Sequence, residues 1–477
     1  MPHLPGPALA LLYLVVCTAP LALSIGRPVA PLDTWEAGAA AAGMVGLAGM
    51  AVQFVTSGRF ETVSGRLGID RIMAFHKIAA WWVLLALLLH PLLYVLPTAL
   101  ERPELGLERL LAYAALPHYR SGGIALGLLF LLVVSSAMRD RLPLRYEWWR
   151  ASHVLLGLGS IGAGLHHVLT TGRLSAGAGP QAFWWVLGGS VVMVMAVLYG
   201  WRWLKLHQRP WTLASVDKRA DRMWELDIQP APGTPPLPYR AGQFVWMTEG
   251  RRRFPLFDHP FSIADSPTRP GLSLIIKEAG DFTNTVGSLR PGTPVGIDGP
   301  YGEFVLDAPG ESDAIVLLAG GVGVAPIMGV LRDLVARGDK RPIRLGYAAG
   351  TPANFACLPE IEAAKNVLDL NAILVSEEDA PGWQGQLGRL DAARLATLLD
   401  GLDPARTRAL ICGPGPMVTG VTDALLDLGM PAERVLYERF DYGGGTASRI
   451  DRRRSLALLG IGTALAALAA LLARAIA

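Results

Sequence analysis

Long apolar runs occupy most of the first 200 residues of this chain. A helix needs roughly 18 or more mainly apolar residues to cross the hydrocarbon core of a bilayer. Backbone polar groups in lipid must bond within the chain, so runs of this length predict transmembrane helices. We expect six spans at residues 7–25, 35–55, 73–96, 122–138, 148–170 and 183–204, and a further span at 455–472.

The first run could instead be a signal peptide. It lacks a positively charged start and a clear small-residue cleavage site, so we expect a retained helix. The distribution of charged residues indicates a chain of two parts, because these residues are concentrated between about residues 209 and 454. A membrane part is therefore joined to a water-exposed part.

The formal net charge of +3 is small, and no basic stripe is interleaved with aromatic residues. This excludes nucleic acid as a partner. The three cysteines, Cys17, Cys357 and Cys412, lie far apart and share no disulfide or metal-ligand spacing. Free cysteines of this kind indicate a reducing compartment for the water-exposed part.

Basic residues in the short loops predict the orientation in the membrane. Lys and Arg concentrate on the cytoplasmic side of membrane proteins. Three of the segments between or after the expected spans are rich in them, and these contain Arg59, Arg66, Arg71 and Lys77; Arg139, Arg141, Arg145 and Arg150; and Arg202, Lys205 and Arg209. We therefore expect a plasma-membrane protein whose N-terminus and dehydrogenase part both face the cytoplasm.

Two of the expected spans carry histidines, which are costly at bilayer depth and mark function. His76 and His90 are 14 residues apart in the third span. At 3.6 residues per turn, about 14 residues return to within roughly 40° of the same face after a rise of about 21 Å. One helix therefore presents one imidazole near each leaflet.

The fifth span repeats this arrangement with His153 and the adjacent pair His166 and His167. The third and fifth spans run in the same direction, so His76 can face His153 while His90 faces His166 or His167. Spacing favours His167, and His166 would need a distorted helix. Two bis-histidine sites suit two b-type haems used for electron transfer. The alternative is a set of histidines that only form hydrogen bonds between helices.

Short alternating runs separated by Pro and Gly follow the sixth span and predict a small antiparallel barrel. An aromatic residue followed by a hydroxyl can lie against a flavin ring, and a glycine-containing turn with Lys and Thr can donate to a pyrophosphate. The candidate flavin-binding residues are His259, Pro260, Phe261, Ser262, Ile276, Lys277, Gly280 and Thr283.

Beyond residue 314, apolar strands alternate with helical stretches, which predicts a parallel doubly wound sheet. One buried strand runs directly into a glycine loop and a helix, a unit that binds the phosphates of a dinucleotide. A later strand ends at Cys412, whose thiol could lie beside a nicotinamide or simply fill the core. The candidate nucleotide-binding residues are Gly320, Gly321, Gly323, Pro326, Cys412, Gly413, Pro414 and Met417.

Together these motifs resemble known families. The barrel and sheet are similar to ferredoxin-NADP reductases, and the histidine-bearing spans extend the resemblance to the ferric reductase and NADPH oxidase superfamily. The His-Pro-Phe-Ser run from His259 is close to the His-Pro-Phe-Thr flavin motif of NADPH oxidases. The Glu-Arg-Phe run ending at Phe440 resembles the C-terminal Glu-x-Phe of the family. This resemblance implies that Phe440 covers the flavin where nicotinamide enters, and that Phe440 and Cys412 act at the site of hydride transfer.

Three departures from the family pattern bear on function. In the family the Glu-x-Phe usually ends the chain, whereas a glycine linker at 443–445 and the last apolar run follow here. Oxygen-reducing members carry a further His one helical turn beyond the outer ligand of the third span, and this chain has Tyr94 there. The second strand of the nucleotide sheet is followed by no Arg that could pair with a 2′-phosphate, which favours NADH or use of both nucleotides.

We therefore expect a multi-domain membrane protein. Its parts are a six-helix haem bundle (1–207), an antiparallel FAD-binding β-barrel (208–308), an α/β doubly wound NAD(P)H-binding domain (309–441), a linker (442–454) and an additional C-terminal transmembrane helix (455–477). The resemblance implies an oxidoreductase that moves electrons from cytoplasmic NADPH or NADH through FAD and two haems to an outer acceptor. Oxygen is the expected acceptor, and ferric iron or a periplasmic partner protein is the alternative.

Overall fold

The computed structural model describes residues 6–27, 32–57, 69–250, 254–306, 308, 310–440 and 447–477. Two of the loop arginines that predict orientation, Arg59 and Arg66, lie outside the described residues, as does the glycine linker at 443–445. The chain divides into two compact units, one formed by Met1–Gly200 with Ser455–Ala477 and one by Trp201–Arg454. The finer domain boundaries given above stay predictions.

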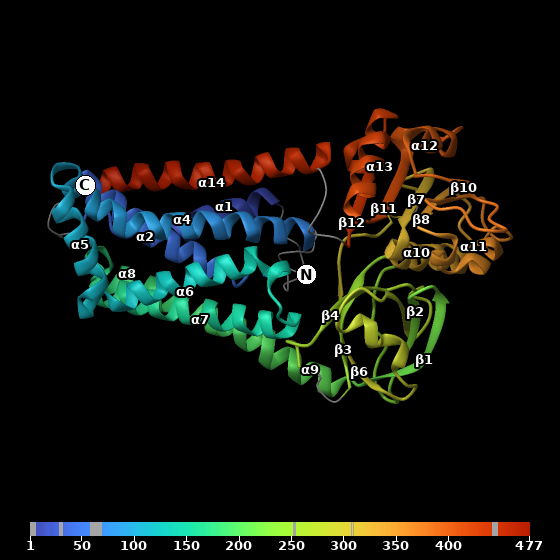
Figure 1. The fold of residues 1–477 in the computed structure, drawn as a ribbon, viewed down its shortest axis with the longest axis horizontal. Coiled ribbons are helices and arrows are strands. Elements are labelled where there is room, and N and C mark those ends of the chain that lie inside the picture. Colours follow the sequence, from blue (N-terminus) through green and yellow to red (C-terminus); the bar gives the residue numbers. More distant parts are fainter. Residues whose placement is uncertain are drawn as a thin grey trace. The chain divides into compact units, whose positions relative to one another are not determined.

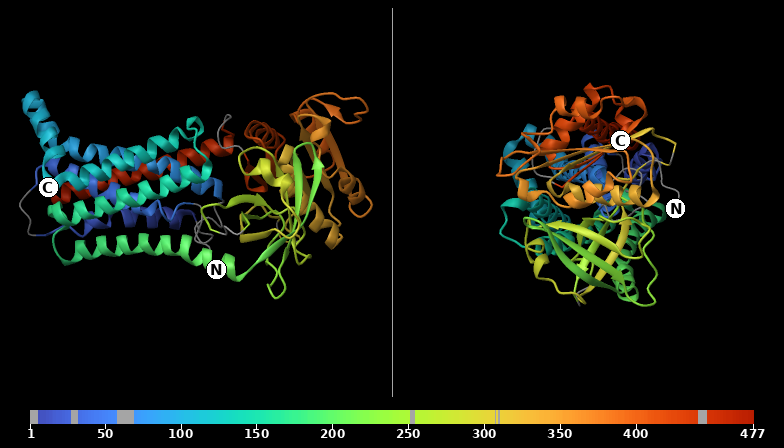
Figure 2. Two further views of the ribbon diagram at one scale, coloured as in Figure 1. Left: turned by 60° about the horizontal axis from the view of Figure 1, so that its bottom comes forward. Right: turned by 90° about the vertical axis from the view of Figure 1, so that its right-hand side faces the viewer.

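The first unit is helical, as the apolar runs predict. Among the described residues, six helical segments are long and apolar enough to cross a membrane, and α1 is a shorter apolar helix of 17 residues. Figures 1 and 2 show the long helices side by side. The helices are α1 (Gly6–Ala22), α2 (Thr34–Val52), α4 (Ile69–Glu101), α5 (Pro103–Ala115), α6 (Arg120–Ala137), α7 (Tyr146–Thr171), α8 (Ala178–Met195), α9 (Arg202–Gln208) and α14 (Arg449–Ile476), with a π-helical turn at Ala196–Trp201.

Helix α5 was not predicted. It follows α4 after a single residue, and it begins at Pro103, whose missing amide and fixed φ suit the first position of a helix. Several of its leucines are exposed, including Leu107 at 59% and Leu111 at 60%. This segment lies between the expected spans at residues 73–96 and 122–138.

Glycines on α2 bring that helix close to α4. A Cβ at Gly43 would lie 2.5 Å from Nδ1 of His90, and one at Gly46 would lie 2.8 Å from Leu87. Gly49 faces Val83 in the same way, at 3.2 Å. Small residues let helix backbones approach closely in an apolar medium, where dispersion contacts and hydrogen bonds drive association. The glycine face of α2 therefore sets the position of the histidine-bearing helix.

The C-terminal helix contributes to the core of the same helical unit. A Cβ at Gly462 would lie 2.7 Å from Nε1 of Trp82 on α4. Leu465 and Ala473 are buried in one apolar cluster with residues of α1, α2, α4, α6, α7 and α8. The predicted apolar helix after the nucleotide-binding domain is therefore present and packed.

The second unit begins with an antiparallel six-stranded barrel. Its strand order is β4-β3-β6-β1-β2-β5, and a bridge between Ile263 and Leu274 joins the two ends of the sheet. Closure of this kind removes exposed strand edges. The strands are β1 (Trp211–Ala220), β2 (Met223–Pro230), β3 (Phe244–Glu249), β4 (His259–Ser262), β5 (Leu272–Lys277) and β6 (Pro294–Tyr301).

A parallel sheet with flanking helices completes the second unit, as the strand and helix alternation predicts. Its order is β10-β9-β8-β7-β11-β12. Strands β8 to β10 are added on one side of the first strand, β7, and strands β11 and β12 on its other side. The elements are β7 (Ala314–Gly320), α10 (Val324–Arg337), β8 (Ile343–Ala349), α11 (Leu358–Ala364), β9 (Leu370–Ser376), β10 (Gln386–Leu387), α12 (Ala392–Leu398), β11 (Thr407–Gly413), α13 (Gly415–Asp427) and β12 (Val435–Arg439). Ligands of such sheets bind at the carboxyl ends of the strands near this change of side.

Candidate functional site

The inner histidine pair joins α4 to α7. The ring centroids of His76 and His153 lie 6.3 Å apart. Nδ1 of His153 is 2.9 Å from the hydroxyl oxygen of Ser136 on α6. Nδ1 of His76 is buried and has no hydrogen-bond partner among the described residues. A buried imidazole nitrogen without a partner is costly, so this pair has unused bonding capacity inside the bundle.

The outer pair has the same separation. The ring centroids of His90 and His167 also lie 6.3 Å apart. The carbonyl of Ala39 is 2.7 Å from Nδ1 of His90, and because a carbonyl only accepts, His90 donates there and keeps its Nε2 lone pair free. The side chain of His166 is exposed. The structure thus brings His167, and not His166, to His90.

These two pairs fit a metal held between imidazoles. The ring separation of 6.3 Å in each pair leaves room for an iron that both imidazoles would hold. A second hydrogen bond on the far ring nitrogen orients a ligating histidine, and Ala39 and Ser136 supply that bond to one histidine of each pair. Gly122 leaves room for the His167 ring, which a Cβ would approach to 3.0 Å. The residues present therefore suit two bis-histidine haems.

Tyr94 lies one turn beyond His90, with its ring 5.5 Å from the His90 ring in an edge-on arrangement. Tyr119 borders the other histidine of the outer pair, with its ring 6.4 Å from that of His167. His118 stands next to it and is exposed, and His207 after the sixth span is exposed as well. The outer pair is thus bordered by tyrosines rather than by a further buried histidine among the described residues.

The predicted flavin-binding run forms strand β4 of the barrel. Each of its residues pairs with β3, and Ser262 faces Phe244 in the register. The His259 ring stacks on that of Phe282, with centroids 4.3 Å apart and planes 2° from parallel. Phe261 is half-buried and Pro260 is exposed, whereas Ser262 is buried. The run therefore presents an aromatic surface beside a buried hydroxyl, as a flavin ring would need.

The glycine-containing turn after β5 is organised by Thr283. Its hydroxyl oxygen accepts hydrogen bonds from the backbone amides of Ala279, at 2.8 Å, and Gly280, at 2.9 Å. Two of the amides that the sequence suggested for a pyrophosphate are thus bonded within the turn. Lys277 ends β5 beside Ile276, which is buried in the barrel core. Thr283 shapes this turn, and Lys277 remains the cationic group next to it.

The nucleotide glycine loop packs against the loop after β11. A Cβ at Gly320 would collide with Sδ of Met417 and lie 2.8 Å from Cδ of Pro414, and one at Gly323 would collide with the carbonyl oxygen of Cys412. Gly321 is different, because its φ is +53° and a Cβ there would meet nothing within 4 Å. Gly320 and Gly323 are therefore needed for loop packing, while Gly321 lies open at the carboxyl edge of the sheet. Pro326 is buried in the first turn of α10.

Cys412 and Phe440 lie at the same edge of the sheet. The Cys412 side chain is fully buried in the core of the sheet. Of the two roles that the sequence allowed, the thiol therefore fills the core in this structure. Phe440 directly follows β12, and its backbone amide donates to the carbonyl of Gly413 at 3.4 Å. The Phe440 side chain is 42% exposed. The exposed Phe440 side chain therefore belongs to the edge of the sheet that carries the nucleotide loops.

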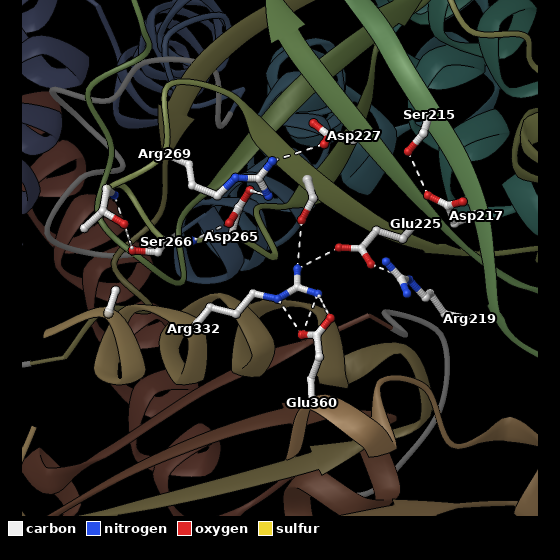
Figure 3. A pocket seen from close by; sticks show the side chains of 13 residues that line it. Ser215, Asp217, Arg219, Glu225, Asp227, Asp265, Ser266, Arg269, Arg332 and Glu360 are labelled. Carbon is white, nitrogen blue, oxygen red and sulfur yellow. Dashed lines mark hydrogen bonds and ion pairs between the residues drawn. The ribbon is translucent and has the colours of Figure 1, made fainter. Parts of the chain in front are cut away.

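An arginine that sequence reasoning missed ties the sheet to the barrel. Arg332, on α10, donates to Glu225 on β2 at 2.7 Å and to Glu360 on α11 at 2.8 Å. It also donates to Ser273 at 2.9 Å and to the carbonyl of Ala264 at 2.5 Å. Figure 3 shows its guanidinium group between the two carboxylates, in a polar pocket of about 330 Å³. No sequence motif marks this residue, because its partners lie 28 to 107 positions away.

Burial and neighbouring positive charges shift the pKa of the Glu225 carboxyl in opposite directions. Burial alone would raise the pKa of the Glu225 carboxyl, but hydrogen bonds and positive charge from Arg332, with a contribution from Arg219, hold that pKa below its usual value. The same pairing outweighs burial in raising the pKa of Arg332. Cys357 lies beside Glu225 and Glu360, and burial raises the pKa of its thiol to about 12. The cluster is therefore an ion-pair network with a protonated, unreactive thiol.

Family comparisons agree with this division of the chain. Residues 42–164 match the ferric reductase like transmembrane component, residues 208–305 match an FAD-binding domain, and residues 317–423 match the oxidoreductase NAD-binding domain. The chain has the ferric reductase/NADPH oxidase-like architecture. A protein of this architecture is an oxidoreductase, and this one carries FAD-binding and NAD(P)H-binding domains beside its apolar helices.

Known proteins are similar to parts of the chain. The reductase component of propane 2-monooxygenase from Mycolicibacterium goodii is 30% identical over 38% of this chain and 53% of its own length. A flavohemoprotein from Bacillus subtilis is 26% identical over 50% of this chain and 60% of its own length. The chain thus spans little more than half of these relatives. The crystal structure of a flavohemoglobin from Malassezia yamatoensis aligns with 86% of this chain and 100% of its own, at 17% identity and a TM-score of 0.47.

Removing Arg332 tests the junction between barrel and sheet. We expect Arg332→Met to lower the free energy of unfolding by about 3 kcal/mol, because it leaves the buried Glu225 carboxylate without its main partner. The measurement is thermal or urea unfolding of the full chain in detergent. Unfolding is monitored by the fluorescence of the released flavin. Arg406→Met is the matched control, since Arg406 and its partner Asp313 are both exposed, and it should cost less than about 1 kcal/mol. Equal losses in the two variants would contradict the assignment.

The lowered pKa of Glu225 also predicts a pH dependence. A carboxyl whose pKa is lower in the folded state stabilises the protein fully above its ordinary pKa, here 4.5, and loses that contribution as pH falls through the lower folded value. Stability should therefore drop on acidification in this range. Glu225→Gln should flatten this part of a stability-against-pH curve. A curve of unchanged slope would show that other carboxyl groups cause the acid sensitivity.

Proposed function

We propose that this oxidoreductase passes electrons from cytoplasmic NAD(P)H through FAD and two b-type haems to an acceptor on the outer side of the plasma membrane. The observation that carries the proposal is the repeated 6.3 Å separation of two imidazole pairs, which lie 14 residues apart along both α4 and α7. His76 and His153 would hold the inner haem, and His90 and His167 the outer haem. Bound haem supplies one-electron transfer without an open coordination position.

At the cytoplasmic end, the residues of the second unit bind and orient. Ser262 and the aromatic surface of β4 support the flavin ring, and Lys277 lies where a diphosphate charge needs a partner. Gly321 and the start of α10 offer backbone amides to the nucleotide phosphates. Phe440 shields the flavin until nicotinamide enters. No Arg stands after β8 for a 2′-phosphate, which supports NADH or use of both nucleotides.

For the acceptor, we propose oxygen, with superoxide as the product. Ferric chelate is the second candidate, and Tyr94 favours it, because this phenol takes the place of the histidine that the resemblance associates with oxygen reduction. A periplasmic protein acceptor is the third. Each of the three would meet the outer pair from the side on which Tyr94 and Tyr119 border it.

Substitution of single histidines tests the haem assignment. We expect His76→Ala and His153→Ala each to remove the same haem, and His90→Ala and His167→Ala each to remove the other, because a bis-histidine site needs both rings. Each variant should retain about one haem of two. The measurement is haem per protein by the pyridine haemochrome method, with the low-spin spectrum of the reduced protein.

His166→Ala is the matched control, since this exposed imidazole neighbours His167 in the chain but lies away from His90. It should keep both haems and the wild-type spectrum. A haem loss in His166→Ala with none in His167→Ala would reverse the assignment of the outer ligand. Two haems in all four single variants would show that these histidines only bond between helices.

Anaerobic reduction followed by addition of an acceptor tests the path and its end. NADH, and to an equal or smaller extent NADPH, should bleach the flavin and then produce the reduced-haem spectrum. Oxygen should then reoxidise the haem with cytochrome c reduction that superoxide dismutase abolishes. Reoxidation by ferric chelate alone would replace oxygen with iron, and reoxidation by neither would favour a protein acceptor. If neither nucleotide bleaches the flavin, the proposed donor is wrong.

A further inference from the structure

The first two turns of α14, residues 449–454, have no role in the proposed electron path. They precede the apolar part of the helix and belong to the same compact unit as the nucleotide-binding sheet. They contain four arginines and Asp451. A transmembrane anchor needs no such contacts on the sheet, so the bonds that these turns make call for their own explanation.

Asp451 is the centre of these bonds. One of its carboxylate oxygens accepts from the hydroxyl of Tyr437 at 2.5 Å, and the other accepts from the guanidinium of Arg439 at 2.5 Å. The second oxygen also accepts from the hydroxyl of Ser448, at 2.7 Å, and from its amide, at 3.1 Å. Tyr437 and Arg439 are both on β12. One helical carboxylate thus holds two side chains of the edge strand.

Neighbouring contacts strengthen the same attachment. Arg454 donates to the Tyr437 hydroxyl at 2.5 Å, and its guanidinium lies 5.0 Å from the centre of the Tyr437 ring. Arg449 pairs with Asp427 at 2.5 Å at the end of α13, and Ile450 is buried in the apolar cluster on that side of the sheet. Ser448 is fully buried. The start of α14 is therefore packed against β12 and α13 and is not merely tethered to them.

The geometry of β12 connects this attachment to Phe440. Successive side chains of a strand point to opposite faces, so Tyr437 and Arg439 occupy one face while Glu438 occupies the other. Glu438 lies on the barrel side, where its carboxylate would come within 3.7 Å of a Cβ at Gly302. Phe440 follows at a bend directly after Arg439, and its amide donates to the carbonyl of Gly413 on β11. Holding Tyr437 and Arg439 therefore fixes the direction in which Phe440 leaves the strand.

We propose that the first two turns of α14 form a clamp on β12 that positions Phe440, with Asp451 as the positioning residue. This inference rests on the proposed function, because it assigns the clamp a role through the aromatic ring that shields the flavin. β12 is the last strand of its sheet and pairs only with β11. The start of α14 supplies a second support to this edge strand.

Asp451→Asn tests the clamp in the full-length protein. The variant keeps the shape of the side chain but removes its negative charge. Its hydrogen bond to Arg439 is then weaker, because it is no longer a bond between opposite charges. Under anaerobic conditions, we expect the rate of flavin reduction by NADH to change by about tenfold, because small displacements of positioning groups have effects of that size. Flavin and haem content should equal those of the wild type. Tyr437→Phe, which removes one hydroxyl, should give a smaller change in the same direction.

Two comparisons make the test specific. Asp313→Asn is the matched control, since Asp313 pairs with Arg406 at the opposite, amino-terminal edge of the sheet, and it should leave the rate at the wild-type value. In a Phe440→Ala background, Asp451→Asn should change the rate by less than about twofold, because residues acting through one another are not additive. A full tenfold change in that background would overturn the proposal, as would a wild-type rate in the single variant.

Hydrogen exchange provides a readout that does not depend on turnover. The backbone amides of β12 and Phe440 should exchange faster in Asp451→Asn than in the wild type, while those of β7 should be unchanged. Unchanged exchange in β12 would refute the clamp even if neither nucleotide reduced the wild-type flavin. Reduction of the wild type together with unaltered rates and exchange in the variant would refute the clamp and leave the proposed function intact.

Discussion

Imidazole nitrogens inside an apolar helical bundle must find partners, because an unsatisfied polar group away from water is costly. The helical unit is arranged around this requirement. Helix α2 offers the Ala39 carbonyl and the Gly43 gap to His90, and α6 offers Ser136 to His153 and the Gly122 gap to the outer pair. Two helices without histidines thus determine how the two histidine-bearing helices meet.

The reductase unit depends in a similar way on one helix. α10 begins at the nucleotide glycine loop and carries Gly329 and Arg332 to the barrel. A Cβ at Gly329 would collide with the carbonyl of Ile263, the residue that directly follows strand β4. Arg332 bonds to Ala264 one residue later. The strand proposed to support the flavin and the loop proposed to support the nucleotide are therefore joined through one helix, as hydride transfer between two bound rings would require.

The assignments of the reductase part and of the helical part are supported by different observations. In the reductase part, residues 208–305 match an FAD-binding domain and residues 317–423 match the oxidoreductase NAD-binding domain. The haem assignment rests instead on a family match to residues 42–164 and on the spacing and packing of four histidines. α14 adds a feature to this architecture, since its apolar part packs with the helical unit and its charged start packs with β12.

The sequence alone determined the apolar spans, the presence of an antiparallel barrel and a parallel sheet, and the 14-residue spacing that puts two histidines on one helix face. These are periodic, local properties that neighbouring residues express whatever the rest of the chain does. Only the tertiary structure placed His167 rather than His166 beside His90, assigned Gly320 and Gly323 to loop packing, and revealed the bonds of Arg332 and of Asp451. Each of these depends on which elements meet in space, and contacts between residues distant along the chain leave no periodic signal in the sequence.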